Sequence, residues 1–564
     1  MHVLMRYHGE SGLNSSRTGQ DLSLLPNLAR DPVAFDGELK QPLRFREAMS
    51  ALHDVVVSDL RYQPKDKTAY EDWKRQERSR EQTIYRQVYK QAKHQTLQEV
   101  GISPQMERDY QAAVKRYWDV RLKFSDHLRR NDPGLWRLTM PCDPVITVAD
   151  DVVFFECFSA DESSYGCLTV DREGGLGKSD NTQYGTTNVD YSWNLYDQFQ
   201  GLRTYRQTRL NVDPQGFGVS TTGQADYREE KIDLPQGWLR GFMQIQSAMS
   251  LPMRRVTLSR ECMYSLLAWM KRHRAKKSPR AMRFELLPGE SPRIVLEPWE
   301  QAFVSHGTRY DGPPVPPIRV WGARRLMFLS RVLPLADRFE VHLLGTGLPS
   351  FWVARMGEMR LTIGNSGWTA NDWTHGSAVD SLHAPQSPPA SLIDRIAAHV
   401  REKKSASLES VMLATGADGG NCLAALGHLA HSGQLIYDLT AGVYRWRQIM
   451  PRALGEAELG PPNPEIVAGR ALVAARKVRV ESQRNESGSM LIQARIENKR
   501  VEVMLNADGI ITRGTCSCSH HHQNGIRMGP CRHLLAAREA ATSAGPETSS
   551  LESWFDWLRT ARRN

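Results

Sequence analysis

The sequence lacks several features that define large classes of protein. No stretch approaches the ~20 consecutive apolar residues that a membrane-spanning helix needs. The first ten residues contain no apolar run of the length found in a signal peptide. Only eight of the 564 residues are cysteine, and their spacing is not that of a disulfide framework. These absences argue against a membrane protein or a small secreted scaffold and predict a cytoplasmic location.

A readable catalytic motif is also missing, because no nucleophile, base and orienting group occur together. Residues 172–179 end like a phosphate-binding loop, but Arg172 stands where the first glycine is required. We therefore expect no nucleotide binding and no enzyme activity. The weakest alternative is a metal-dependent hydrolase that uses a cluster of acidic residues as metal ligands: Asp143, Asp150, Asp151, Glu156, Asp161 and Glu162. Acidic residues are also common in the turns between strands, and this explains the cluster more simply.

Length and composition describe a globular protein of several domains. A chain of 564 residues exceeds what one hydrophobic core supports, so about three or four domains are expected. Hydrophobic residues make up 40% of the chain and charged residues 24%, which is ordinary for a globular protein. The net charge of +10 permits binding to nucleic acid or another acidic surface, but a solvated surface explains it equally well.

Changes in local character predict a multidomain α+β fold of four parts. Residues 1–140 read as an extended or poorly ordered arm followed by charged helices. Residues 141–376 read as a β-rich α+β domain with short β-prone runs and one helix at about 260–273. Two further domains are predicted, at residues 390–448 and 466–545, each preceded by a linker rich in proline or glycine.

Residues 390–448 carry the pattern of three short helices and a hairpin that turns at residues 440–442. This order resembles a winged helix. The third helix of such domains often enters the major groove of DNA, but here residues 420–428 contain no Lys or Arg. A role of this domain in docking on another protein is therefore at least as well supported as sequence-specific binding to DNA.

Four residues near the C-terminus have the spacing of metal ligands. Cys516-x-Cys518 is followed after twelve residues by Cys531-x-His533. Alternate residues of a strand point to the same side, so both sulfurs of the first pair can face one ion. Pro530 begins a helix-favouring run, which places Cys531 at a helix N-terminus where peptide dipoles favour a thiolate. Three thiolates and one imidazole form a closed set, which predicts one structural Zn²⁺.

One alternative remains open within this site. His520, His521 and His522 follow the first cysteine pair, and any of them could replace His533 as the fourth ligand. We prefer His533 because it lies on the predicted helix, whereas the other three precede a glycine-containing loop.

These residues and their surroundings resemble the SWIM-type zinc finger. Three segments with alternating apolar and polar residues precede the cysteines, at 477–484, 490–497 and 500–505, and Leu534-Leu535-Ala536-Ala537 follow the histidine. The resemblance covers about the last hundred residues. It implies a small β-sheet and a helix joined by zinc, serving nucleic-acid or protein binding rather than catalysis.

Two functions follow from the resemblance. The first is binding of nucleic acid, DNA above all, through basic residues close to the metal ligands: Arg495, Lys499, Arg500, Arg513, Arg527, Arg532 and Arg538. The second is a protein adaptor, because large bacterial SWIM proteins resemble partners of MoxR-type AAA ATPases and von Willebrand A-domain proteins. Binding through phosphates must weaken steeply as salt rises, whereas docking on an apolar surface need not.

Overall fold

The chain forms two compact units in a computed structural model, residues 1–60 with 142–564, and residues 61–141. The second unit is described only at scattered helical positions between 105 and 131, so the charged helices predicted there lie mostly outside the described residues. The structure also describes residues 5–7, 12–15, 19–24, 26, 32–58, 144–177, 182–189, 193–212, 229–231, 236–273, 280–367, 372–373, 379–383, 388–449, 463–486, 489–506 and 509–543.

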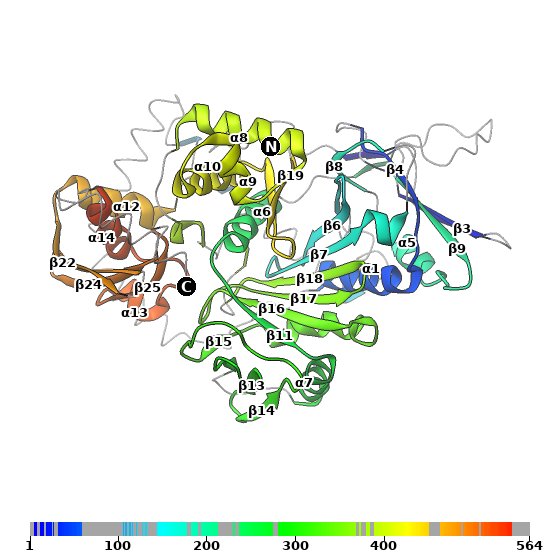
Figure 1. The fold of residues 1–564 in the computed structure, drawn as a ribbon, viewed down its shortest axis with the longest axis horizontal. Coiled ribbons are helices and arrows are strands. Elements are labelled where there is room, and N and C mark those ends of the chain that lie inside the picture. The colour runs from blue at the N-terminus through cyan, green and yellow to red at the C-terminus, as the bar shows by residue number, and fades with distance from the viewer. Residues whose placement is uncertain are drawn as a thin grey trace. The chain divides into compact units, whose positions relative to one another are not determined.

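An eight-stranded antiparallel sheet is the largest feature of the first unit (Figure 1). Its central strands β6 and β7 are rich in Val, Phe and Tyr and are buried along almost their whole length, which requires cover on both faces. The strands follow in the order β11 (Arg254–Leu258), β16 (Arg338–Leu343), β17 (Ser350–Met356), β18 (Met359–Asn365), β7 (Ser164–Asp171), β6 (Val152–Phe158), β5 (Val145–Val148) and β8 (Gly185–Asn188).

Helix α1 (Pro42–Val56) covers one face of β6 and β7. Phe45 meets Phe155 edge to face, with 5.8 Å between ring centroids. Leu52 lies so close to β7 that a Cβ at Gly166 would come within 2.7 Å of its side chain. Helix α1 therefore belongs to the core of the central sheet.

The predicted N-terminal arm is extended but is paired rather than free. β2 (Gly12–Ser15) and β3 (Gly19–Leu24) form a second sheet with β4 (Phe35–Glu38) and β9 (Gln207–Val212). β3 runs parallel to β9, with Leu22 opposite Leu210. The partner strand lies far away in the sequence, so local patterns give no indication of the pairing.

A small antiparallel sheet with a helix follows in the chain. The predicted helix is α7 (Arg260–Arg272), which Ser259 caps by accepting a hydrogen bond from the Cys262 amide at 3.2 Å. The sheet has the order β14 (Gln301–Val304), β13 (Arg293–Leu296), β12 (Met282–Glu285) and β15 (Ile318–Val320). With the central sheet and its helices, these elements make the first unit an α+β structure.

Three helices and a hairpin occupy residues 390–446, as the pattern predicts. They are α8 (Ala390–Lys403), α9 (Leu408–Thr415), α10 (Gly419–His431), β20 (Leu435–Asp438) and β21 (Val443–Trp446), with the short strand β19 (Ser405–Ala406) beside β21. Their buried residues form one hydrophobic cluster, and Ser407 and Asp418 cap α9 and α10. Membership of the winged-helix class stays a prediction.

The hairpin β20–β21 and helix α10 dock inside the chain. Arg445 on β21 forms ion pairs with Asp151 and Asp438, and Arg447 forms one with Glu156 on β6 at 3.4 Å. α10 contacts α6 (Gln236–Met249), where the Ser247 hydroxyl lies 3.3 Å from the His431 ring. Part of the surface of both elements is therefore covered by other parts of the first unit.

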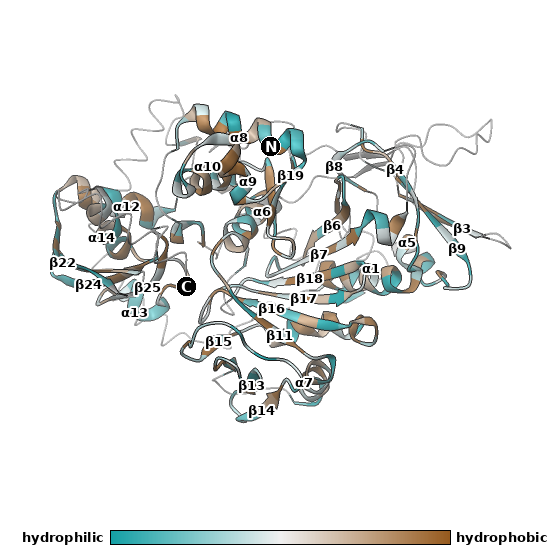
Figure 2. Ribbon diagram, viewed as in Figure 1, coloured by the Kyte–Doolittle hydropathy of each residue, from teal (hydrophilic) through white to brown (hydrophobic). Residues whose placement is uncertain are grey.

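A four-stranded antiparallel sheet and two packed helices form the C-terminal module. The strands β22 (Val478–Glu486), β23 (Ser489–Ile496), β24 (Lys499–Leu505) and β25 (Ile511–Cys516) follow one another in order. Helices α12 (Pro464–Ala474) and α14 (Arg532–Ser543) pack on each other, with the short helix α13 (Ser519–Asn524) between β25 and α14. Figure 2 shows α12 as largely hydrophobic and α13 as hydrophilic. No described helix combines the length and apolar character needed to cross a membrane.

The buried pair of Glu156 and Arg447 yields a test of the internal docking. Both side chains are fully buried, and burial raises the pKa of Glu156 although Arg447 and the Tyr165 hydroxyl oppose this effect. The substitution Arg447→Met leaves a buried carboxylate without its cation, so we expect a loss of about 3–5 kcal/mol of stability in urea denaturation. The double variant with Glu156→Gln should regain part of the lost stability, because the buried charge is then removed.

The exposed pair of Lys477 and Glu497, 2.8 Å apart, serves as the control. Its two side chains are about half exposed, so Lys477→Met should cost no more than about 1 kcal/mol. An effect of Arg447→Met as small as that of Lys477→Met would contradict the structural role of the buried pair.

Candidate metal centre

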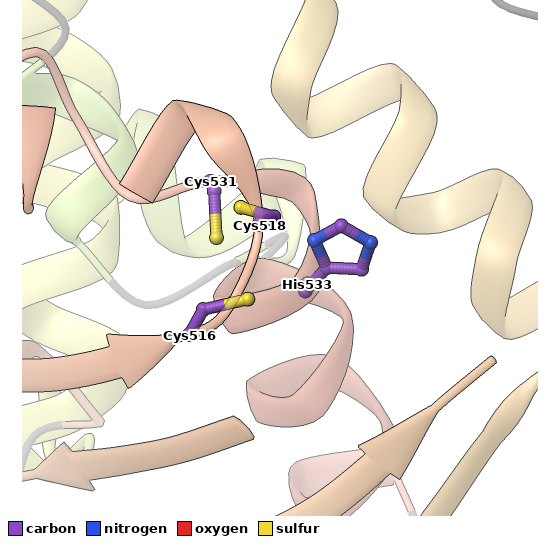
Figure 3. A group of neighbouring side chains, drawn as sticks. All are labelled: Cys516, Cys518, Cys531 and His533. Atoms are coloured by element: carbon purple, nitrogen blue, oxygen red, sulfur yellow. The ribbon is translucent and has the colours of Figure 1, made fainter. Parts of the chain in front are cut away.

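Four side chains converge at the junction of β25, α13 and α14. The ligand atoms of Cys516, Cys518, Cys531 and His533 all lie within 4.8 Å of one another (Figure 3). All four residues are buried, with at most 9% of any of them exposed. Among the described residues, this is the group of His, Cys, Asp and Glu side chains close enough together to hold a metal ion.

The first pair of cysteines joins a strand to a helix. Cys516 is the last residue of β25, and Cys518 is the N-cap of α13. The Cys518 sulfur accepts a hydrogen bond from the backbone amide of His521 at 3.4 Å. An amide that points at a sulfur stabilises the thiolate form, which is the form that binds metal.

The second pair lies at the start of α14. Cys531 precedes the helix directly and its carbonyl accepts a hydrogen bond from the Leu535 amide at 3.1 Å, while His533 lies in the first turn. Glu465 of α12 accepts bonds from the Arg532 amide at 2.7 Å and from its guanidinium at 2.9 Å. This carboxylate fixes the helix N-terminus that positions both ligands.

Close packing of α14 on the sheet completes the site. Gly514 of β25 lies beneath Leu534, and a Cβ at this glycine would come within 2.6 Å of the leucine side chain. Gly469 of α12 faces the backbone of α14 in the same way, with Arg532 O 3.1 Å from the position of a Cβ. Larger residues at either glycine would displace the helix and the ligands it carries.

The crowded ligand atoms influence one another's protonation. Hydrogen bonds with Cys516 and Cys531 lower the pKa of Cys518, and hydrogen bonds with Cys516 and Cys518 raise the pKa of Cys531. Burial acts to lower the pKa of His533, but hydrogen bonds to Cys516 and Cys518 outweigh it and raise this pKa to about 9. The site therefore holds protons that a bound cation would replace, since metal binding requires thiolates and a neutral imidazole.

The three consecutive histidines lie outside this group. His520, His521 and His522 belong to α13, and the group of four contains His533 in their place. The sequence predicts a loop here, whereas the structure has a helix because the Cys518 side chain caps it. The preference for His533 over its three competitors agrees with this geometry.

The seven predicted basic residues separate into two sets. Arg495, Lys499, Arg500 and Arg513 lie on strands β23, β24 and β25. Within the strand set, Arg495 pairs with Glu481 and Arg513 with Glu502. The second set, Arg527, Arg532 and Arg538, also binds within the chain. Arg527 donates to the backbone oxygens of Asn524 and Gln523, and Arg532 to Glu465.

Arg538 departs most clearly from the predicted surface position. It is only 4% exposed and donates hydrogen bonds to the carbonyl oxygens of Leu382 and His383, at 3.1 and 2.7 Å. Burial lowers its pKa to about 10. The prediction failed at this residue because a charged residue on an amphipathic helix is usually solvated, whereas here the α14 face that carries it turns inward.

Three arginines form a row across the outer face of the C-terminal sheet. Arg479 on β22 lies opposite Arg495 on β23, which lies opposite Arg500 on β24. All three are exposed, while alternate residues such as Ile492 and Val503 point inward and are buried. Arg495 pairs with Glu481 at 3.1 Å, whereas no described acidic residue pairs with Arg479 or Arg500.

Three of the acidic residues considered for catalysis have side-chain partners within the chain. Glu156 pairs with Arg447, and Asp151 with Arg445. Asp161 accepts hydrogen bonds from the Ser159 and Ser163 hydroxyls, both at 2.6 Å, and these bonds help to lower its pKa against the effect of burial. Asp143 lies outside the described residues.

Sequence reasoning missed two residues of the module. Glu465 supports the second ligand pair, and Asn463-Pro464-Glu465 has the form of a helix start, which could have revealed α12 at the end of the predicted linker. Arg479 belongs to the arginine row, and the alternation along residues 477–484 already places it on the polar face of its strand.

Comparison with known proteins identifies no family. No protein-family model matches the chain, and a search of curated proteins finds no match. Among solved structures, the chain is similar to a crystal structure of the proliferating cellular nuclear antigen of Entamoeba histolytica, at 9% identity and a TM-score of 0.32. This match covers 59% of the present chain and 98% of the other. A TM-score this low supports no conclusion about fold or function.

Removal of one sulfur tests the metal centre. We expect Cys516→Ser to abolish metal binding, because each ligand contributes to a closed set whose binding energy, about 10–16 kcal/mol in small zinc modules, is also folding energy. Metal content by mass spectrometry should fall to zero. Limited proteolysis should then digest the module from residue 464 onward and leave the central sheet intact.

Cys262→Ser is the matched control, since Cys262 is a buried cysteine of α7 outside the group of four. This variant should keep both its metal and its protease-resistant module. A Cys516→Ser protein whose C-terminal segment resists protease as the wild type does would contradict the structural role of the metal.

Proposed function

We propose that this chain is a zinc-stabilised, non-catalytic binding protein whose C-terminal module binds nucleic acid, with DNA as the first candidate. The bound metal supplies no reaction in this proposal. It joins β25 to α14, and thereby holds the sheet whose outer face carries the ligand. The resemblance to the SWIM-type zinc finger supports both the metal and the kind of ligand.

Zinc is the metal that the donor set favours. Thiolates and imidazole are soft or borderline ligands, which select zinc over Mg²⁺ or Ca²⁺, and a buried set of three sulfurs and one nitrogen suits tetrahedral coordination. Such a set leaves no position for substrate. A structural role for the ion follows from this chemistry.

The arginine row of Arg479, Arg495 and Arg500 is the observation that carries the proposal. Side chains directly opposite on neighbouring strands have Cβ atoms about 5 Å apart, and like charges in such positions destabilise a sheet. Sheet stability therefore gives no reason for three arginines in this register. Binding of phosphate groups would explain the three arginines, because a guanidinium group binds phosphate oxygens through pairs of hydrogen bonds.

Further cations extend this face. Arg476 and Lys477 line one shallow surface hollow together with Arg479 and Arg495. The Lys and Arg residues in and around the row outnumber the acids paired with them, Glu481 and Glu497. A positive surface of this kind attracts a polyanion irrespective of its sequence.

A protein adaptor is the second candidate. Leu491 on β23 and Met504 on β24 lie opposite each other on the same outer face and are partly exposed. An apolar pair bordered by arginines suits a protein interface, where Arg and Met are enriched. The family resemblance supplies the candidate partners, an AAA ATPase of MoxR type and a von Willebrand A-domain protein.

Salt dependence of binding tests the first candidate against the second. For DNA, the slope of log K against log salt is about −0.9 for each neutralised phosphate, so Arg479→Ala and Arg500→Ala should each weaken binding and flatten the slope by about one. Fluorescence anisotropy with labelled duplexes between low and physiological salt measures both quantities.

Arg470→Ala is the control for these variants, because Arg470 is exposed on α12 rather than on the outer face of the sheet. Its affinity and slope should match those of the wild type. Wild-type protein that holds zinc but binds no nucleic acid at low salt would overturn the first candidate and leave the adaptor.

A further inference from the structure

We propose that a cluster of four aromatic rings, Trp269, His273, Trp299 and Phe303, is a second nucleic-acid site, on which the bases of single-stranded DNA or RNA stack. We call it the ring cluster. This proposal rests on the proposed nucleic-acid function and extends it, since it adds a single-stranded ligand and a site outside the zinc module.

The rings of the cluster come from three elements of the small sheet and its helix. Trp269 and His273 lie at the end of α7, Trp299 lies in the turn between β13 and β14, and Phe303 lies on β14. His273 stacks on Trp269 with 4.0 Å between centroids and 18° between planes. Trp299 and Phe303 meet Trp269 edge to face, at 4.7 and 6.3 Å.

The cluster is open to solvent at its edge. Trp299 is 39% exposed, and His273 is exposed at the last turn of α7. Trp269 holds both residues in place, through its ring contacts and through its carbonyl oxygen, which lies 3.0 Å from His273 Nδ1. Two flat rings with fixed orientation are therefore presented outward, and large aromatic side chains are otherwise found mostly buried.

The charges around the cluster suit a polyanion. Lys271 and Arg272 occupy the last turn of α7 and are exposed. The nearest carboxylate in sequence, Glu300, is paired with Arg283. Glu297 is paired with both Arg283 and Arg319. Because these acids are neutralised, Lys271 and Arg272 remain as the charges near the rings. Proteins that bind single strands combine aromatic side chains, which stack with bases, and Lys or Arg, which contact phosphates.

A single strand fits the cluster better than a duplex. The bases of a duplex are stacked on one another and present only their edges, whereas an unpaired base presents a flat face to an aromatic ring. The mode of contact also differs from that of the arginine row. Stacking depends weakly on salt, while contacts to phosphate depend on it strongly.

Trp299→Ala in the full-length, zinc-loaded protein tests the proposal. Anisotropy titrations would use fluorescent 20-nucleotide single strands of DNA and of RNA and a DNA duplex, each across a salt series. We expect about tenfold weaker binding of a single strand, DNA or RNA, with an unchanged salt slope and unchanged duplex affinity. Trp299→Phe, which keeps a ring, should restore most of the affinity.

Tyr264→Ala provides the control, because Tyr264 is a 63% exposed aromatic residue on the same helix with no ring contact among the described residues. This variant should bind as the wild type does. Circular dichroism establishes that all variants are folded.

The outcomes separate this proposal from the function on which it rests. If Trp299→Ala binds single strands as tightly as the wild type while Arg479→Ala weakens binding, the ring cluster is not a site and the zinc-module function stands. If Trp299→Ala weakens single-strand and duplex binding equally, the stacking role is overturned. If the wild type binds no nucleic acid at all, both proposals fail.

Discussion

Convergence of three sulfurs and one imidazole on a single point is the constraint on which the C-terminal module depends. Cys516 ends a strand, Cys518 caps a short helix, and Cys531 and His533 begin a longer helix. The sheet is small, and a metal ion bound at this point would tie its last strand to its helix. Glu465 and the close approach at Gly514 hold the same helix from two other sides. The exposed arginine row depends on this packing, because the sheet that carries the row on its outer face is stable only while helix α14 covers its inner face.

The winged-helix-like segment makes contacts with other parts of the first unit through surfaces that DNA binding would need. The hairpin β20–β21 is tied to the central sheet by Arg445 and Arg447, and α10 lies against α6. Burying the pair of Arg447 and Glu156 costs desolvation energy, so it fixes the position of the hairpin more than it adds stability. The arginine row and the ring cluster are the two outward-facing groups that we propose as sites for a polyanion.

Local sequence patterns predicted those features that depend on local physics. β-prone runs predicted strands in the central domain, among them Val145–Val148, and the helix predicted at about residues 260–273 is α7. The spacing of cysteines and histidine gave the group of four that the structure brings together. Patterns could not show the pairing of β3 with β9, because that contact joins distant parts of the chain. They also could not show that Arg538 points inward or that a cysteine side chain starts α13, since both depend on tertiary packing.

The central claim is that one closed, structural zinc site joins the sheet and helix of the module. X-ray absorption at the zinc edge on the purified full-length protein tests it most directly. One zinc per chain, with three sulfur neighbours at about 2.3 Å and one nitrogen at about 2.0 Å, is the predicted result. Absence of zinc, or a site with oxygen ligands and an open position, would contradict it, because the ion would then be either missing or free to take part in chemistry.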